Sequence, residues 1–208
     1  MIELFTSDTP NGKKITILLE EIGCDFKVTP MDLSRDDQFK PSFKKISPFG
    51  KIPVIVDHEN KKSIFESGAI LMYLAEKYNK FYEIKDRNII NQWLMAQMGT
   101  IGPMLGQHHQ FHHYNPGKSK FGEERFFKIA IRLYGELDER LASSKFLAGS
   151  NYTIADIATW PWIARHEWHD IGLNNYKNLT RWYLDIASRE AVIRGYDLLK
   201  NGSVIPKS

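Results

Sequence analysis

The sequence predicts a two-domain protein with an α/β N-terminal half and an all-helical C-terminal half. Up to about residue 78, short segments of alternating polarity are interspersed with amphipathic helical segments. Beyond about residue 86, the apolar residues recur only at helical spacing. A chain of 208 residues is long enough for two small domains. We therefore expect one domain over 1–78, a second over 86–208 and a linker over 78–86.

The start of the chain predicts a strand, a helix and a second strand. Residues 2–5 alternate in polarity, and Thr9 followed by Pro10 is typical of a helix start. Gly23 is typical of a helix end, and residues 26–28 alternate again. Apolar residues recur at helical spacing between these ends: Ile15, Leu18, Leu19 and Ile22. This order predicts a parallel strand pair joined by a crossover helix.

A hairpin and a third helix complete the N-terminal half. Residues 34–47 are polar and irregular, whereas residues 52–56 are apolar and β-branched. A turn over 57–61 allows residues 63–65 to pair back as a second strand, and a helix is expected over 69–77. The order βαβ followed by ββα is thioredoxin-like.

The C-terminal half contains five predicted helices. The step from Gly102 to Pro103 is expected to kink the first of them. Thr153 and Asp156 have the spacing of a capping box, which indicates a role in folding. The predicted ranges are 86–112, 122–142, 153–168, 176–188 and 190–200.

Composition excludes several classes of protein. The net charge of +3, from 28 basic and 25 acidic residues, is too small to indicate nucleic-acid or membrane-surface binding. Cys24 is the single cysteine, which excludes an internal disulfide, a CxxC pair and a cysteine-rich zinc site. We find neither a signal-peptide pattern nor the roughly 18 consecutive apolar residues of a membrane span. The lone thiol fits a reducing compartment, so we expect a cytoplasmic protein.

Three local patterns together resemble those of the glutathione transferase superfamily. They are Gly50-Lys51-Ile52-Pro53-Val54, Phe65-Glu66-Ser67-Gly68-Ala69-Ile70 and Asn151-Tyr152-Thr153-Ile154-Ala155-Asp156-Ile157. Their order and spacing extend the resemblance over nearly the whole chain. A finer match consists of Thr9-Pro10-Asn11-Gly12-Lys13-Lys14, Gln38, Arg132 and Trp160-Pro161-Trp162. It resembles the bacterial nu class, which is similar to the glutathione-dependent disulfide-bond oxidoreductases and to the fungal nitrogen regulator that forms prions.

The resemblance implies that Thr9 and Asn11 are the catalytic residues. In the nu-class subgroup no tyrosine, serine or cysteine of the protein activates the glutathione thiol, and Thr and Asn at the first helix serve the sulfur instead. A helix N-terminus with neutral hydrogen-bond donors favours a thiolate. The alternative is that both residues simply cap the helix.

The resemblance also implies a cradle for the rest of glutathione. Glu66 would bind the α-ammonium group and Ser67 the α-carboxylate, although a plain capping pair is the alternative for both. Pro53 is expected to be cis, which would allow the backbone of Ile52 to pair with the cysteinyl part of the ligand. A trans proline on an edge strand is the alternative.

Three further residues are candidates for binding carboxylate groups of the ligand. Gln38 and Lys51 would bind the glycyl carboxylate, and a solvated lysine is the alternative for Lys51. The resemblance implies that Arg132 reaches the ligand cleft, where its guanidinium group would bind a carboxylate. A solvated helix arginine is the alternative.

Two other features of the sequence are not expected to take part in metal binding or catalysis. The pairs His108–His112 and His109–His113 have i, i+4 spacing, which suits a metal, but no HExxH motif or carboxylate accompanies them. We expect no metal, and instead a role for these histidines in lining the cleft between domains or capping a helix. Cys24 follows the end of the first helix, away from the expected sulfur site, and is expected to be a half-buried residue without a catalytic role.

The resulting functional hypothesis is a glutathione-dependent enzyme that acts on small disulfides by thiol–disulfide exchange. Glutathione would be the cosubstrate, and weak conjugation of glutathione to electrophiles is a second activity. Family analogy implies a homodimer, with no nucleic-acid or membrane partner. The alternative is a non-catalytic glutathione-binding regulatory module on the same fold.

Overall fold

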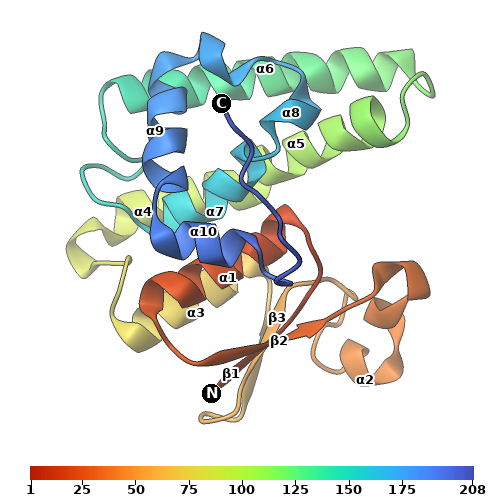
Figure 1. Cartoon of the computed structure of the whole chain (residues 1–208), viewed down its shortest axis with the longest axis vertical. Helices are drawn as coiled ribbons and strands as arrows, with labels where there is room; N and C mark the ends of the chain where they lie inside the picture. Colours follow the sequence, from red (N-terminus) through yellow and green to blue (C-terminus); the bar gives the residue numbers. More distant parts are fainter. The chain divides into compact units, whose positions relative to one another are not determined.

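The computed structural model describes all residues from 1 to 208, which form two compact units (Figure 1). The first unit contains Met1–Tyr82 and Arg189–Val204, and the second contains Glu83–Ser188 and Ile205–Ser208. The boundary after Tyr82 falls inside the expected linker. Residues 189–204 group with the N-terminal unit, whereas the sequence pattern places them in a domain over 86–208.

A four-stranded mixed sheet forms the centre of the first unit, in the order β2-β1-β3-β4. β1 pairs parallel with β2 and antiparallel with β3, and β3 pairs antiparallel with β4. Leu4 lies opposite Val28 on one side and Ile55 on the other. The strands are β1 (Ile2–Thr6), β2 (Phe26–Pro30), β3 (Val54–Asp57) and β4 (Lys62–Phe65). The predicted fold class, a thioredoxin-like domain followed by helices, is confirmed.

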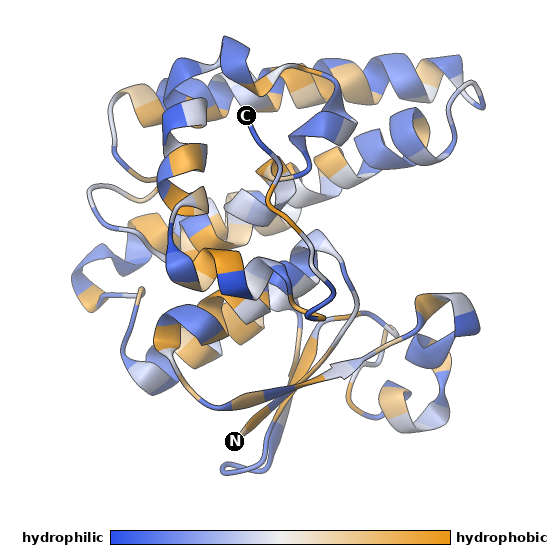
Figure 2. Ribbon diagram, viewed as in Figure 1, coloured by the Kyte–Doolittle hydropathy of each residue, from blue (hydrophilic) through white to orange (hydrophobic).

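Helices α1 (Pro10–Ile22) and α3 (Ser67–Tyr78) pack against each other beside this sheet. Thr9 caps α1 as expected, because its Oγ1 accepts the Gly12 N–H at 3.1 Å. Figure 2 shows hydrophobic residues along the strands and on both helices, and hydrophilic residues at the turn between β3 and β4. The irregular stretch contains three short turns of helix, namely Leu33–Arg35, Asp37–Phe39 and α2 (Pro41–Lys44).

Close helix packing explains why the C-terminal segment joins the first unit. Helix α10 (Glu190–Tyr196) lies along α1, where a side chain on Gly195 would place its Cβ 2.6 Å from the Ile17 Cα. The Thr16 hydroxyl donates to the Gly195 carbonyl at 2.6 Å. Helical periodicity in the sequence indicates that α10 has an apolar face, but it does not indicate which domain covers that face.

The second unit consists of helices. α4 (Arg87–Ala96), a π turn (Gln97–Ile101), α5 (Gly102–His108) and a second π turn (His109–Tyr114) follow without interruption. The expected irregularity near Gly102 therefore takes the form of a π turn that ends just before it. The remaining helices are α6 (Lys120–Ala142), α7 (Ile154–Ile163), α8 (His166–His169) and α9 (Lys177–Ala187). None of the helices has both the length and the apolar character that crossing a bilayer requires.

Helix α7 is the core of the second unit, because every one of its residues is buried. The predicted capping box at its start is present, and the Asp156 carboxylate also accepts from the Leu147 N–H and from the indole N–H of Trp182, both at 2.9 Å. The expected helix over 153–168 ends early, and α8 begins separately at His166. Burial raises the pKa of Asp156 to about 6, although these donors favour its ionised form.

We predict that Asp156→Ala lowers the free energy of unfolding by about 3 kcal/mol or more, because several buried donors would lose their acceptor. Urea denaturation followed by circular dichroism measures this change. Asp185→Ala on α9 is the control, since the Asp185 side chain is 45% exposed and its ion pair with Arg181 is an exposed one. Equal destabilisation by the two substitutions would contradict the importance assigned to Asp156.

Candidate functional site

Strand direction brings the predicted site residues of the first unit to one edge of the sheet. β1, β2 and β4 run in the same direction and β3 runs against them. Their ends at this edge precede Thr9, Gln38 and Glu66 in the chain, and the start of β3 at the same edge follows Ile52. The loops that carry the candidate ligand-binding residues therefore all leave the sheet on one side.

The first turn of α1 lies directly against the end of β1. A Cβ on Gly12 would stand 2.4 Å from the Thr6 Oγ1 and 2.6 Å from the Ser7 carbonyl oxygen, so only glycine fits. The Thr9 N–H donates to the Ser7 carbonyl at 2.8 Å. This packing fixes the position of the helix N-terminus relative to the sheet.

Thr9 and Asn11 provide neutral polar groups at this helix N-terminus. The Thr9 oxygen accepts the capping hydrogen bond, but a hydroxyl retains its own proton and can donate it to a ligand. Capping and ligand binding are therefore compatible for Thr9. Asn11 is the second residue of α1 and is half-buried, and the first turn contains no acidic residue. The dipole of α1 is thus available to an anion.

The N-terminus of α3 is a second place where the backbone favours an anion. The Ile70 N–H donates to the Glu66 carbonyl at 2.9 Å, so the N–H groups before Ile70 have no acceptor within the helix. No side chain caps α3, and its first turn has no acidic residue. Ser67 is buried at its first position. The positive end of the α3 dipole therefore favours a carboxylate ligand.

Glu66 has an unusual backbone conformation and an exposed side chain. Its φ of 70° is in the left-handed region that residues other than glycine rarely adopt. Such conformations concentrate at ligand sites, where surrounding packing maintains them. Its carboxylate makes no capping hydrogen bond to α3, so it is available to a cationic group.

Lys14 contacts the candidate residue Ser67 and was not predicted as a site residue from the sequence. Its side chain is 1% exposed, and its Nζ donates to the Ser67 Oγ at 3.3 Å. Burial lowers the pKa of Lys14 well below its usual value. Lys14 precedes Leu18 by one helical turn and thus shares the apolar face of α1, a signal that was visible in the sequence.

The loop before β3 is held by Ser47. The buried Ser47 hydroxyl accepts the Lys51 N–H at 2.9 Å and donates to the Lys51 carbonyl at 2.8 Å. The Ile52–Pro53 peptide bond is cis, as predicted. Ile52 precedes the first residue of β3, so its peptide groups lie outside the paired positions of the sheet. The Lys51 side chain is exposed.

Gln38 lies against the same loop. A Cβ on Gly50, which has a φ of 61°, would be 2.8 Å from the Gln38 carbonyl oxygen. The Gln38 amide nitrogen is 3.5 Å from the Asp36 carboxylate, while its Oε1 is buried and accepts no hydrogen bond from the protein. A buried amide oxygen gains from a donor, and the peptide N–H groups of a tripeptide are donors of this kind.

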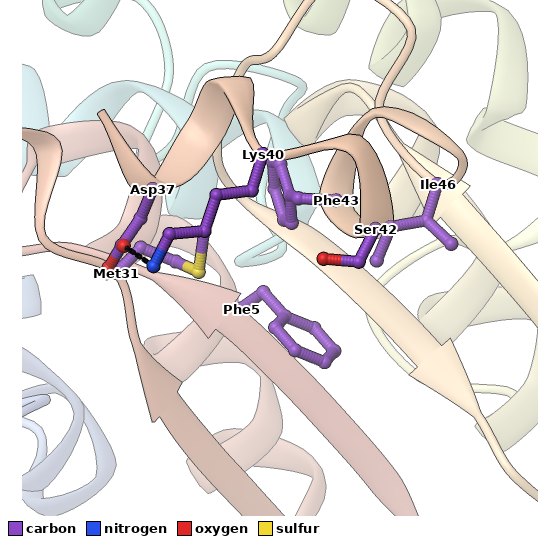
Figure 3. Close-up of a pocket in the computed structure, with 7 residues that line it drawn as sticks. All are labelled: Phe5, Met31, Asp37, Lys40, Ser42, Phe43 and Ile46. Carbon is purple, nitrogen blue, oxygen red and sulfur yellow. Dashed lines mark ion pairs between the residues drawn. The ribbon is translucent and has the colours of Figure 1, made fainter. Parts of the chain in front are cut away.

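A cavity of about 320 Å³ lies between the sheet and α2 (Figure 3). The rings of Phe5 and Phe43 line it with centroids 6.2 Å apart, and an ion pair of 2.5 Å joins Lys40 to Asp37 at its side. The Lys40 ammonium lowers the pKa of Asp37. None of the predicted site residues lines this cavity.

Arg132 is on α6 in the second unit. Its side chain is 65% exposed and pairs with Glu136 at 3.4 Å, one helical turn further on. The other candidate residues all belong to the first unit.

Comparisons with known proteins identify the family of the chain. The model for the N-terminal domain of glutathione S-transferases matches residues 2–76, and the model for their C-terminal domain matches residues 120–190. The chain belongs to the glutathione S-transferase family. A protein of Escherichia coli strain K12, described as disulfide-bond oxidoreductase YfcG, is 45% identical over 96% of this chain and 95% of its own length. Protein URE2 of Saccharomyces bayanus is 28% identical over 89% of this chain and 66% of its own length.

Solved structures of bacterial relatives contain glutathione. A glutathione transferase of Burkholderia graminis has two glutathione molecules bound per subunit; its TM-score is 0.90 at 36% identity, with 97% of this chain and 89% of that chain covered. A glutathione transferase of Pseudomonas putida has one glutathione disulfide bound per subunit. Its TM-score to this chain is 0.88 at 36% identity, with 95% of this chain and 91% of that chain covered. The predicted resemblance, including its disulfide-oxidoreductase and fungal branches, is confirmed.

Cys24 follows α1 at the end opposite to Thr9 and Asn11, as expected. Thirteen residues of helix, about 20 Å, separate the two ends. The thiol is half-buried, and burial raises its pKa, which lowers the fraction of nucleophilic thiolate. Cys24 therefore lacks both the position and the reactivity of a catalytic nucleophile at this site.

The histidines that follow α4 are packed inside the second unit. The rings of His109 and His169 stack with centroids 4.7 Å apart, and the His108 Nε2 lies 2.9 Å from the His169 carbonyl oxygen. The Tyr134 hydroxyl lies 2.6 Å from the His169 Nδ1. No group of three or more potential metal ligands comes together in the structure. Burial lowers the pKa of His109 to about 3, and it also lowers those of His108, His166 and His169.

We predict that the protein loses stability as the pH falls below about 6.5, the ordinary histidine pKa. The unfolded chain takes up protons there that the buried histidines exclude, and each excluded proton costs about 1.4 kcal/mol per pH unit until the folded-state pKa is reached. Urea midpoints at about pH 7.5, 6.5 and 5.5 measure the effect. His109→Gln should have a flatter pH dependence than the wild type, and an identical dependence would contradict this account.

Proposed function

We propose that the protein is an enzyme that binds glutathione or glutathione disulfide and catalyses thiol–disulfide exchange on small disulfides. The observation that carries the proposal is the N-terminus of α1, where Thr9 and Asn11 offer neutral donors and no protein thiol is present. The name of the Escherichia coli relative and the glutathione disulfide in the Pseudomonas putida structure support this choice. The cytoplasm is the compartment that suits a glutathione-dependent protein with one free cysteine.

In the proposed complex, each loop at the sheet edge binds a different part of glutathione. Ser67 and the N-terminus of α3 bind the γ-glutamyl carboxylate, and Glu66 binds the neighbouring ammonium group. The backbone of Ile52, before the cis Pro53, pairs with the cysteinyl residue. These contacts orient the sulfur toward the N-terminus of α1.

Three residues are proposed for the other carboxylates. Gln38 and Lys51 bind the glycyl end, since their loops are in contact through Gly50. Arg132, which is exposed on α6, binds a carboxylate of the ligand or of a second glutathione. No metal takes part in the proposed reaction.

The reaction uses sulfur atoms from the substrates only. A bound glutathione thiolate attacks one sulfur of the disulfide, a new S–S bond forms, and the other sulfur leaves as a thiolate that takes up a proton. A free thiol has a pKa of about 8.5. Lowering this value by two units requires roughly 2.7 kcal/mol of preference for the anion, which the donors and the dipole of α1 supply in part. Addition of the same thiolate to an electrophile is a weaker second activity.

Replacement of Asn11 and of Cys24 tests the proposed chemistry. Asn11→Ala should lower kcat/KM for glutathione-dependent reduction of bis(hydroxyethyl) disulfide by about tenfold or more, because a hydrogen bond to a charged group is worth about 1.5–3 kcal/mol. Cys24→Ser should stay within about twofold of the wild type. Matched melting curves show whether either variant has lost its fold.

Each opposite outcome has a definite meaning. Loss of turnover in Cys24→Ser but not in Asn11→Ala would replace the proposal with a mechanism based on a protein cysteine. Tight glutathione binding by a wild-type protein without any turnover would instead favour a non-catalytic binding module.

A homodimer is the proposed assembly. The first unit exposes large aromatic side chains, with Phe49 69% and Phe39 57% exposed. Such residues suit a protein–protein contact.

We predict that sedimentation gives twice the chain mass of 24.1 kDa at micromolar concentration, and that Phe49→Ser shifts the protein toward the monomer. Phe121→Ser, in which a residue 75% exposed on α6 is replaced, is the matched control and should not dissociate the protein. A stable wild-type monomer would contradict the assembly.

A further inference from the structure

The cavity between the sheet and α2 has the lining of a small-molecule site. Ligand pockets are mostly apolar with a few polar groups, and a volume of about 320 Å³ is at the lower end of their range. Phe5 extends from β1 on the sheet side, and Phe43 and Ile46 line the side of α2 and the loop that follows it (Figure 3). Met31 adds a thioether, which makes favourable contacts with aromatic rings. This lining suits a small aromatic ligand.

The charged groups of the cavity balance each other. Lys40 and Asp37 are the only charged residues that line it, and their side chains form an ion pair of 2.5 Å. The Lys40 ammonium lowers the pKa of Asp37, and a lysine is ordinarily protonated near neutral pH. The Asp37 carboxylate also accepts the Asp32 N–H at 2.9 Å, which fixes its position beside the cavity. The wall of the cavity therefore presents one positive and one negative group with no net charge.

A ligand with a net charge gains little from such a pair. An anionic group that approaches the Lys40 ammonium is repelled by the Asp37 carboxylate at a similar distance, and a cationic group is repelled by the ammonium in the same way. Moving either kind of charge from water to an apolar lining also costs free energy. A hydroxyl group avoids both effects, because it donates to the carboxylate and accepts from the ammonium without separating them.

Ser42 adds an uncharged polar group to the same cavity. It belongs to α2, and its hydroxyl makes no hydrogen bond to another residue. Figure 3 shows this hydroxyl directed into the space between α2 and Phe5. A serine hydroxyl both donates and accepts, so it complements a second hydroxyl and does not favour a charged group of either sign.

We propose that this cavity binds a free, uncharged aromatic alcohol of the phenol or naphthol class. The aromatic ring packs against Phe5 and Phe43, and the hydroxyl lies at the pair of Lys40 and Asp37. Binding is non-covalent. It is independent of the proposed glutathione chemistry, which uses none of the residues that line the cavity.

Four naphthalene derivatives of similar size test the preference for an uncharged hydroxyl. They are 2-naphthol, 2-methoxynaphthalene, which cannot donate a hydrogen bond, 2-naphthoate, which is an anion, and 2-naphthylmethylammonium, which is a cation. Calorimetry measures their affinities for the wild type at neutral pH without glutathione. The wild type should bind 2-naphthol about tenfold or more tightly than each of the other three, because only 2-naphthol satisfies both charged groups.

Two substitutions that fill the cavity show where 2-naphthol binds. Ser42→Trp and Ile46→Trp should each weaken its binding by about tenfold or more, because the indole occupies the space of the ligand. Lys45→Trp is the matched control, since Lys45 is exposed and does not line the cavity, and its affinity should stay within about twofold of the wild type. Thermal melting of each variant shows whether it folds, and either cavity variant decides if the other does not fold.

Two further substitutions remove one charge each and should change the order of the ligands. Lys40→Met leaves the carboxylate without its ammonium partner, so 2-naphthylmethylammonium should become the tightest ligand. Asp37→Asn leaves the ammonium without its carboxylate, so 2-naphthoate should become the tightest ligand. Lys45→Met, which removes an exposed charge outside the cavity, should keep the order of the wild type. These variants alone decide if neither tryptophan variant folds.

Three results would overturn the proposal. The first is a wild-type protein that binds a charged derivative more tightly than 2-naphthol, or that binds 2-naphthol with a Kd above about 1 mM. The second is equal affinity of the wild type and the folded tryptophan variants for 2-naphthol, which would place the ligand elsewhere. The third is an unchanged order of the four ligands in both charge variants, which would exclude a role for the ion pair.

Discussion

The pairing of the four strands is the constraint on which the site depends. β1, β2 and β4 end at the same edge of the sheet, and β3 begins there. Two helices, α1 and α3, start at this edge, so the positive ends of two helix dipoles lie on the same side of the sheet. A ligand with a thiolate at its centre and a carboxylate at its end is suited to two such positive ends. The remaining contacts refine a preference that the backbone already provides.

Close backbone contacts at a few positions turn this topology into a defined site. Gly12 lets the first turn of α1 touch the end of β1, and Gly50 lets the loop before β3 touch the carbonyl of Gln38. Ser47 then ties both backbone groups of Lys51 into a fixed loop. These residues need not touch the ligand. They determine where the candidate ligand-binding groups lie, so their replacement is expected to change the geometry of the candidate site.

Local sequence signals predicted most of the elements of the first unit, whereas the candidate site residues came from the family resemblance. Thr9, Pro10 and Gly23 marked the ends of α1 because capping chemistry depends on neighbouring residues only. The assignment of α10 to the first unit was not predictable, because Gly195 meets Ile17 through contacts between distant parts of the chain. Lys14 was missed because a lysine in a helix normally suggests solvent, although its spacing from Leu18 placed it on the buried face.

The pKa of the glutathione thiol in the complex tests the central claim most directly. Ultraviolet absorbance of the thiolate, titrated with pH in the presence of saturating wild-type protein, measures it without any turnover. The account predicts a value about two units below the roughly 8.5 of a free thiol, and most of this shift should disappear in Asn11→Ala. An unshifted thiol pKa in a complex that otherwise forms tightly would contradict the claim that the N-terminus of α1 stabilises the thiolate.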